Sequence, residues 1–167
     1  MPLAFPSRRI ITDSNENTRA PLLFSGVPDE LLAPSANLPF GDYSLEGLEW
    51  RTAVEFKRMG DLVACCTHRR DHFLKQLVQM SDMELPHVVF GFTIDDIVQQ
   101  RYGTGTHPRS ILGTLSTYAN TFPGVGFHFV STNPTYCASW TRELLCKAEK
   151  AIEKTEVRRE REQGAKA

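Results

Sequence analysis

The apolar pattern in the first third of the chain is that of short β-strands. A β-branched run occupies residues 9–12, and two longer runs follow at residues 38–45 and 50–57. Glu46-Gly47, which lies between the two longer runs, is typical of a hairpin turn. We therefore predict one short strand, then a surface loop at residues 25–37, and then a hairpin.

The spacing of apolar residues becomes helical in the middle of the chain. From residue 61 to about residue 80 they recur at three- and four-residue intervals, which predicts one continuous helix. Thr93 and Asp96 have the spacing of a capping box, and Pro108 suits the first turn of a helix that ends near residue 122. A long last helix is predicted to begin at Asn133-Pro134.

Two short apolar runs, HVVFGF at residues 87–92 and GVGFHFVST at residues 124–132, have the composition of buried strands. Strands first, and then strands and helices in alternation, predict an α/β domain whose mixed sheet is covered by helices. We predict a single domain over residues 1–157 and a charged, frayed tail at residues 158–167.

Composition narrows the class of protein. The chain has 167 residues, of which 41% are hydrophobic and 23% charged, as in ordinary globular domains. Its net charge of −1 gives no global attraction for nucleic acid, so a polyanion would have to be held by a local patch or by metal ions. No long apolar run follows a basic segment at the start, which predicts a cytoplasmic protein without a signal peptide or membrane anchor.

Four charged residues stand out around the predicted hairpin: Asp42, Glu55, Lys57 and Asp61. Glu55 and Lys57 are two residues apart on one strand, so their side chains share one face of the sheet. Asp42 lies on the preceding strand of the hairpin, and Asp61 opens the helix that follows. We therefore expect the four side chains to converge at one edge of the sheet.

Such a group suits metal-dependent hydrolysis of a phosphodiester bond. Carboxylate oxygens are the ligands that Mg²⁺ or Mn²⁺ prefers, and Lys57 could orient or help to deprotonate the attacking water and offset charge on the phosphate. Taken alone, however, the short E-x-K pattern is more often a solvated strand face, with Asp61 serving as a helix cap.

A wider match favours the chemical interpretation. LPFGDYSL followed by VEFKRMGDL resembles the nuclease domain of the XPF-type structure-specific endonucleases, whose signature is G-D, a spacer and E-R-K-x-x-x-D. IITDSNENTRAPLLF resembles the first strand of that family, which ends in D-x-R-E, and adds Asp13 and Glu16 to the acidic group. DIVQQRYGTGTHPRSILGTL resembles the stretch downstream of the motif in short phage and bacterial members, so the resemblance spans roughly residues 10–152.

The resemblance implies a restriction-endonuclease-like, PD-(D/E)XK core that cuts DNA with Mg²⁺ or Mn²⁺, a place in DNA repair and, in many members, a homodimer. The predicted function is a metal-dependent DNA endonuclease or nickase. In this interpretation Asp42, Glu55 and Asp61 hold the metal. Lys57 orients or helps to deprotonate the attacking water, and Asp13 and Glu16 are supporting acidic residues that shape the site.

The sequence departs from the family pattern at two positions. Asn15 and Phe56 stand where the family has arginine, which removes two cationic groups near the expected metal site. An inert DNA-binding or dimerisation module that keeps the nuclease fold is therefore the alternative, and a small-molecule phosphohydrolase is a third class. The helix-hairpin-helix module of many relatives is absent from this sequence, so the resemblance does not imply junction specificity.

Further candidates for contact with DNA are basic residues. Arg58, Arg69, Arg70 and Lys75 lie on or near the helix after the motif, and Arg109 flanks the loop GTGTHP. They are predicted to hold phosphates, or else to form an ordinary solvated surface.

Two other patterns have structural explanations that we favour. Cys65, His68 and His72 recur on one face of the predicted helix, as ligands of a soft metal would, but a packed cysteine beside surface histidines is the preferred interpretation. Six aromatic residues sit at core-like positions, so we do not expect base stacking from them. They are Trp50, Phe73, Phe90, Phe127, Phe129 and Trp140.

Overall fold

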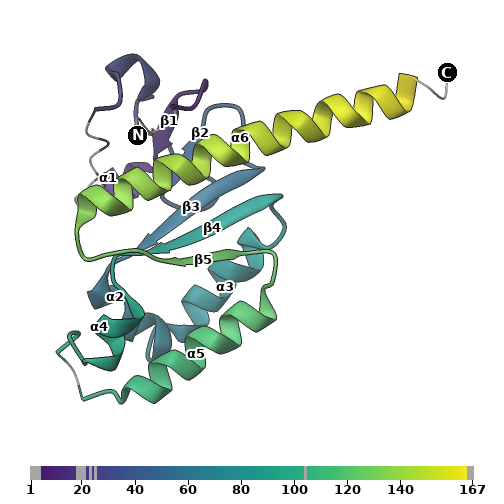
Figure 1. Ribbon diagram of the computed structural model, residues 1–167. Coiled ribbons are helices and arrows are strands. Elements are labelled where there is room, and N and C mark those ends of the chain that lie inside the picture. Colours follow the sequence, from purple (N-terminus) through teal and green to yellow (C-terminus); the bar gives the residue numbers. More distant parts are fainter. Residues whose placement is uncertain (1–4, 18–21, 23, 25, 104, 165–167) are drawn as a thin grey trace.

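A five-stranded mixed sheet with helices on both faces forms the body of the protein in the computed structural model (Figure 1). The structure describes residues 5–17, 22, 24, 26–103 and 105–164. The strands, which follow one another in chain order across the sheet, are β1 (Ile10–Thr12), β2 (Tyr43–Leu45), β3 (Thr52–Lys57), β4 (Leu85–Phe90) and β5 (Gly126–Phe129). Strand β2 is antiparallel to both of its neighbours, β1 and β3, whereas β3, β4 and β5 are parallel. The predicted α/β class and the predicted hairpin are thus confirmed.

Helices cover the two faces of this sheet unequally. The helical elements are α1 (Ser14–Asn17), the 3₁₀ helix η1 (Asp29–Leu31), α2 (Met59–Cys66), α3 (Arg70–Met80), α4 (Ile94–Val98), α5 (Pro108–Thr121) and α6 (Pro134–Gly164). Helices α2 to α5 lie on one face and α6 crosses the other (Figure 1). The predicted capping box at Thr93 and Asp96 and the predicted start of α5 at Pro108 are both present.

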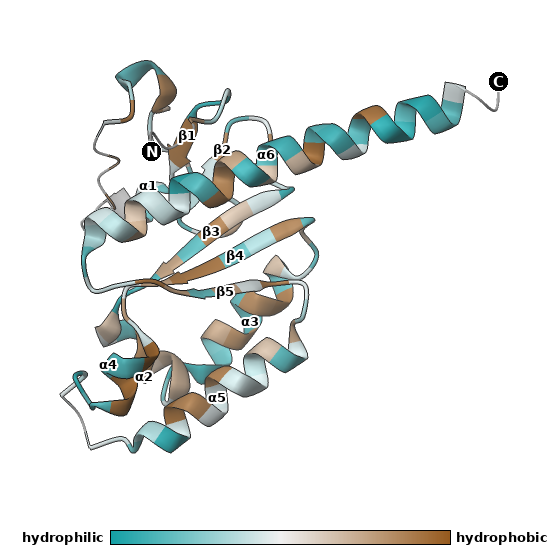
Figure 2. Ribbon diagram, viewed as in Figure 1, coloured by the Kyte–Doolittle hydropathy of each residue, from teal (hydrophilic) through white to brown (hydrophobic). Residues whose placement is uncertain are grey.

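Two hydrophobic cores lie on opposite faces of the sheet because the side chains of each strand alternate between the faces. Val54 and Phe56 of β3 pack in the core under α6, whereas Val88 and Phe90 of β4 pack in the core with α2, α3 and α5. Figure 2 shows the hydrophobic colour along β3 and β4 and the mostly hydrophilic end of α6 that projects from the body. The central strands are therefore covered on both sides, as their composition requires.

The single helix predicted over residues 61–80 is wrong, because the chain forms two helices here. At Thr67 the backbone leaves the helical conformation, with φ −126° and ψ −107°, and its hydroxyl donates to the carbonyl oxygen of Val63 at 2.6 Å. The backbone N–H groups of Thr67 and Arg69 both donate to the Ala64 carbonyl oxygen, at 3.2 and 2.8 Å, in place of the regular i→i−4 bonds of a continuing helix. Helical periodicity persists across the break because α2 and α3 bury their apolar residues in the same core.

The last helix is longer than predicted. Residues 158–164 are helical and exposed, so the helix continues past the end of its apolar pattern, and residues 165–167 lie outside the described part of the chain. Arg158 donates to Glu162 one turn later at 2.8 Å, a type of pair that stabilises exposed helices slightly.

Two of the six aromatic residues that were predicted to lie in the core are exposed. Phe73 and Phe90 are buried, and Phe127 and Phe129 pack partly against the same core. The side chain of Trp50, however, is 70% exposed, and that of Trp140 is 44% exposed.

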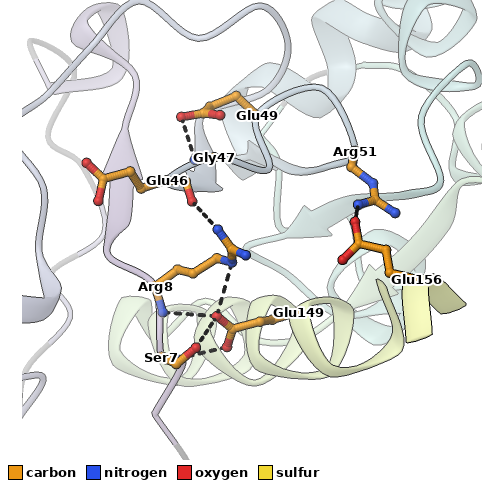
Figure 3. A network of polar contacts seen from close by, with 8 residues as sticks. All are labelled: Ser7, Arg8, Glu46, Gly47, Glu49, Arg51, Glu149 and Glu156. Atoms are coloured by element: carbon orange, nitrogen blue, oxygen red, sulfur yellow. Dashed lines mark hydrogen bonds and ion pairs between the residues drawn. The ribbon is translucent and has the colours of Figure 1, made fainter. Parts of the chain in front are cut away.

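The N-terminal segment is tied to α6 by a buried carboxylate (Figure 3). Glu149 accepts hydrogen bonds from the backbone N–H groups of Ser7 and Arg8, at 2.8 and 2.9 Å, and from the Ser7 hydroxyl at 2.7 Å. Further along α6, Glu156 pairs with Arg51, which also binds Glu84 at 2.7 Å. These contacts hold α6 against the strands that it crosses.

Two histidines lie side by side on β4 and β5, on the face that carries α6. The Nδ1 atom of His87 is 3.2 Å from the Nε2 atom of His128, and a Cβ atom on Gly126 would lie within 2.7 Å of both rings. Burial, and secondarily the charge of His128, lower the pKa of His87 to about 4, and burial also lowers the pKa of His128.

Stability is therefore expected to fall as the pH is lowered from about 6.5 to about 4. In that range the unfolded chain binds protons that the native His87 does not, so acid favours unfolding. Urea unfolding across this range should show a shallower pH dependence for His87→Gln than for the wild type. His68→Gln, a change at an exposed histidine, is the control and should follow the wild type. An unchanged slope in His87→Gln would contradict the assignment.

Within the part of the chain that the structure describes, no helix combines the length and the apolar composition needed to cross a membrane.

Candidate active site

Asp42 lies immediately before β2, not on the strand as predicted, and the Asp13 N–H donates to its carbonyl oxygen at 2.7 Å. The preceding Gly41 has φ +71°, and a Cβ atom there would lie 3.0 Å from both the Ala53 Cβ and the Val54 carbonyl oxygen. Glycine therefore lets this segment approach β3 closely. The Asp42 N–H donates to the Val54 carbonyl at 2.8 Å, and the carboxylate Oδ2 accepts from the Phe56 N–H at 2.6 Å.

Glu55 and Lys57 project together from β3 on the side of α2 and α3, as their spacing predicts. The Glu55 side chain is buried, and its Oε1 accepts a hydrogen bond from the Lys57 ammonium. Gln76 of α3 reaches both: its Nε2 lies 3.4 Å from the Glu55 Oε1, and its Oε1 lies 3.4 Å from the Lys57 Nζ. The ammonium also lies 5.1 Å from the centre of the Phe73 ring. The pair is thus held from the helix as well as from the strand.

The environment of Lys57 keeps its side chain charged. Burial alone lowers the pKa of Lys57, but the charge and hydrogen bond of Glu55, with further contributions from Cys65 and Asp42, raise it by more. The net pKa lies above the ordinary value for lysine, so the ammonium is protonated at neutral pH. This state suits neutralisation of a phosphate better than acceptance of a proton from water.

All four residues of the predicted charged group line one cavity of about 680 Å³. Asp42 and the β3 pair lie on one wall, and Asp61 enters from the first turn of α2. The Asp61 N–H donates to the Arg58 carbonyl oxygen at 3.0 Å, which closes that turn. The structure therefore brings the four side chains to a common space, while their catalytic roles stay predictions.

Asp13 lines the same cavity but is already engaged by the backbone. Its Oδ1 accepts from the Leu38 N–H at 2.9 Å and its Oδ2 from the Asn15 N–H at 2.8 Å. The carboxylate thereby ties the end of β1 to the loop that leads to Asp42. The side chain of Glu16, the other predicted acidic residue, lies outside the described part of the structure.

The predicted DNA-binding residues separate into two groups. Arg58 and Arg69 line the cavity, whereas Arg70, Lys75 and Arg109 do not. The Arg58 guanidinium lies 5.1 Å from the centre of the Phe56 ring, which stands where the family signature has arginine. A cation is therefore present next to the position at which one is missing from the motif.

Gln76 and Gln79, which line the cavity from α3, were missed by the sequence analysis, and His72, which also lines it, was considered only as a ligand of a soft metal. The available signal was their position beside the buried stripe Phe73, Leu77 and Met80 on the same helix. Because one continuous helix was predicted over residues 61–80, α3 was not recognised as a separate helix that packs against β3.

The soft-metal pattern is not realised. The break at Thr67 separates Cys65 from the two histidines, and the ring of His68 contacts the Thr67 hydroxyl at 3.3 Å. No three histidine, cysteine or acidic side chains in the described residues are grouped closely enough to form a metal cage. A soft metal such as zinc, which is held mainly by protein ligands, does not fit.

The donor set does fit an ion that keeps most of its water. Mg²⁺ is usually bound through one or two carboxylates and retains several waters, which a cavity of this volume can hold. Asp42, Glu55 and Asp61 supply oxygen ligands only, as Mg²⁺ and Mn²⁺ prefer.

Comparison with known proteins identifies the fold. No family model and no curated protein matches the sequence. The structure is similar to that of XPF from Aeropyrum pernix, with a TM-score of 0.62 and 18% sequence identity. The chain has a restriction-endonuclease-like fold. The similarity covers 82% of this chain and 59% of the Aeropyrum XPF chain, so this chain spans somewhat more than half the length of that one.

Proposed function

We propose that this protein is a metal-dependent DNA endonuclease or nickase that hydrolyses phosphodiester bonds. The observation that carries the proposal is the single cavity lined by the carboxylates of Asp42, Glu55 and Asp61 and by the ammonium of Lys57. The fold shared with an XPF supports it.

Asp42, Glu55 and Asp61 are the residues that would hold Mg²⁺ or Mn²⁺, one or two of them directly and the rest through the waters that such an ion keeps. Such an ion, when bound, polarises a phosphoryl oxygen and makes bound water a stronger nucleophile. The hydrogen bond from the Phe56 N–H orients the Asp42 carboxylate, so this ligand is positioned before the substrate arrives.

Lys57 neutralises charge that builds up on the phosphate during attack by water. Its ammonium is held by Glu55 and Gln76 in a largely buried position, where a fixed charge acts more strongly than in water. Arg58 and Arg69, at the wall of the same cavity, contact the neighbouring phosphates of the strand.

The second candidate is a module that binds DNA, or pairs with an active partner, without cutting. Asn15 and Phe56 favour it, because each replaces an arginine of the family signature. Phe56 is buried in the core under α6, so its side chain cannot supply the missing contact.

The two candidates differ in what happens to supercoiled plasmid and to flap and fork oligonucleotides in Mg²⁺, Mn²⁺ or EDTA. The nuclease predicts nicking or cutting that stops in EDTA and is lost in Asp42→Asn, while DNA binding persists. Asp82→Asn, at an exposed aspartate after α3, is the matched control and should cut like the wild type. Binding of every DNA without cleavage in any metal would instead favour the inert module.

A further inference from the structure

Trp50 is an exposed aromatic residue on the turn between β2 and β3. Its side chain is 70% exposed, and its ring stands edge-on to the ring of Phe40, with 5.6 Å between centroids and 88° between planes. Phe40 lines the candidate active-site cavity and packs against the core beneath α2 and α3. The aromatic pair therefore extends the wall of the cavity outward to the surface.

The turn that carries Trp50 is firmly held. The N–H groups of Arg51 and Thr52 donate to the carbonyl oxygen of Leu48 at 2.9 and 3.0 Å. The side chain of the next residue, Arg51, pairs with Glu156 of α6 (Figure 3). It also pairs with Glu84. The indole ring is thus presented from a rigid support, and little entropy is lost when a ligand packs on it.

An exposed indole beside a cavity that is lined by carboxylates for a metal ion and by three cations has a specific chemical use. A T-shaped contact covers at most one face of the Trp50 ring, and with 70% of the residue exposed the other flat face is accessible. Nucleobases stack on such faces whatever their sequence, provided that they are not paired within a duplex. The cations Lys57, Arg58 and Arg69 in the adjoining cavity attract the phosphates of the same strand.

We propose that Trp50, supported by Phe40, is a stacking site for an unpaired nucleobase of a nucleic-acid strand whose backbone enters the cavity. The assignment rests on the proposed function, since it makes the cavity the site of the phosphodiester. Stacking on Trp50 requires an unpaired base, so the nucleic acid would need a single-stranded segment next to the phosphodiester bond in the cavity.

Fluorescence tests the contact directly, because Trp50 and Trp140 are the two tryptophans of the chain. In Trp140→Phe all tryptophan emission comes from Trp50. With EDTA present, so that nothing is cut, oligodeoxythymidylate should quench this emission and protect it from iodide, whereas a blunt duplex should not. Quenching by thymidine monophosphate alone at the same base concentration would show a free-nucleotide site and overturn the proposal.

Binding of oligodeoxythymidylate by fluorescence anisotropy supplies a second readout in a background that keeps Trp140. Trp50→Leu should weaken binding about 5- to 100-fold, because leucine preserves apolar area but has no aromatic face. Trp50→Tyr, which keeps an aromatic face, should retain most of the binding. Trp140→Leu, at the other exposed tryptophan, is the matched control and should bind like the wild type. Equal binding by Trp50→Leu and wild type would overturn the proposal.

Failure of this inference can be separated from failure of the proposed function. Metal-dependent cleavage without quenching of Trp50 fluorescence would contradict the stacking site and leave the proposed nuclease function supported. Quenching of Trp50 fluorescence and weaker binding by Trp50→Leu, without cleavage in any metal, would support the stacking site and contradict the nuclease function.

Discussion

Lys57→Met is expected to reduce metal-dependent cleavage about 10²- to 10³-fold, as loss of one preorganised charge-stabilising group commonly does. Methionine keeps much of the length and apolar character of lysine but removes the charge. The ammonium that pairs with Glu55 and contacts Gln76 would then be absent from the cavity. Rates on plasmid DNA in Mg²⁺ and Mn²⁺, set against DNA affinity in EDTA, measure the effect on the chemical step.

Lys147→Met is the matched control for this change. Lys147 is an exposed lysine of α6 that pairs with Glu143 one turn away and does not line the cavity. It should leave the cleavage rate within about twofold of the wild type, because exposed ion pairs contribute little. Thermal unfolding of both variants shows whether the buried Glu55 tolerates loss of its partner. A folded Lys57→Met protein that cuts at the wild-type rate would contradict the assigned role.

Gly41→Ala is expected to destabilise the protein by about 2–5 kcal/mol and to reduce cleavage as well. A positive φ costs an alanine about 1–2 kcal/mol, and overpacking costs about 1–3 kcal/mol more. Here the new Cβ would lie 3.0 Å from the Val54 carbonyl oxygen, which belongs to the backbone and cannot rotate away. Relief of this contact moves Asp42, the next residue, away from β3 and from the Phe56 N–H.

Two other glycines separate the causes. Gly103→Ala tests the backbone angle alone, because Gly103 has φ +68° and no atom within 4 Å of an added Cβ. Gly113→Ala, in the exposed middle of α5, adds a methyl group without strain and should stabilise the protein by about 0.5–1 kcal/mol. Urea unfolding of the three variants gives the comparison. If Gly41→Ala lowers the free energy of unfolding no more than Gly103→Ala does, the close approach of residue 41 to β3 does not contribute to stability, and the explanation is contradicted.

Local sequence patterns were sufficient for the elements that carry the site. The two-residue spacing of Glu55 and Lys57 placed both on one face of β3, because neighbouring side chains on a strand point in opposite directions. The run of strands followed by strand and helix in alternation predicted the mixed sheet and its coverage. These features depend on short-range geometry, which a single sequence contains.

Other features of the site depend on contacts between distant segments. Gln76 lies close to Glu55 because α3, which begins after the break at Thr67, packs beside β3. Asp13 matched an acidic position of the motif, yet its oxygens bind the backbone of residues 15 and 38. Trp50 was expected in the core because it is a large aromatic residue, but it lies on the turn between β2 and β3 and is exposed. Periodicity reports which face a residue shares with its neighbours, whereas packing of the whole chain decides what that face meets.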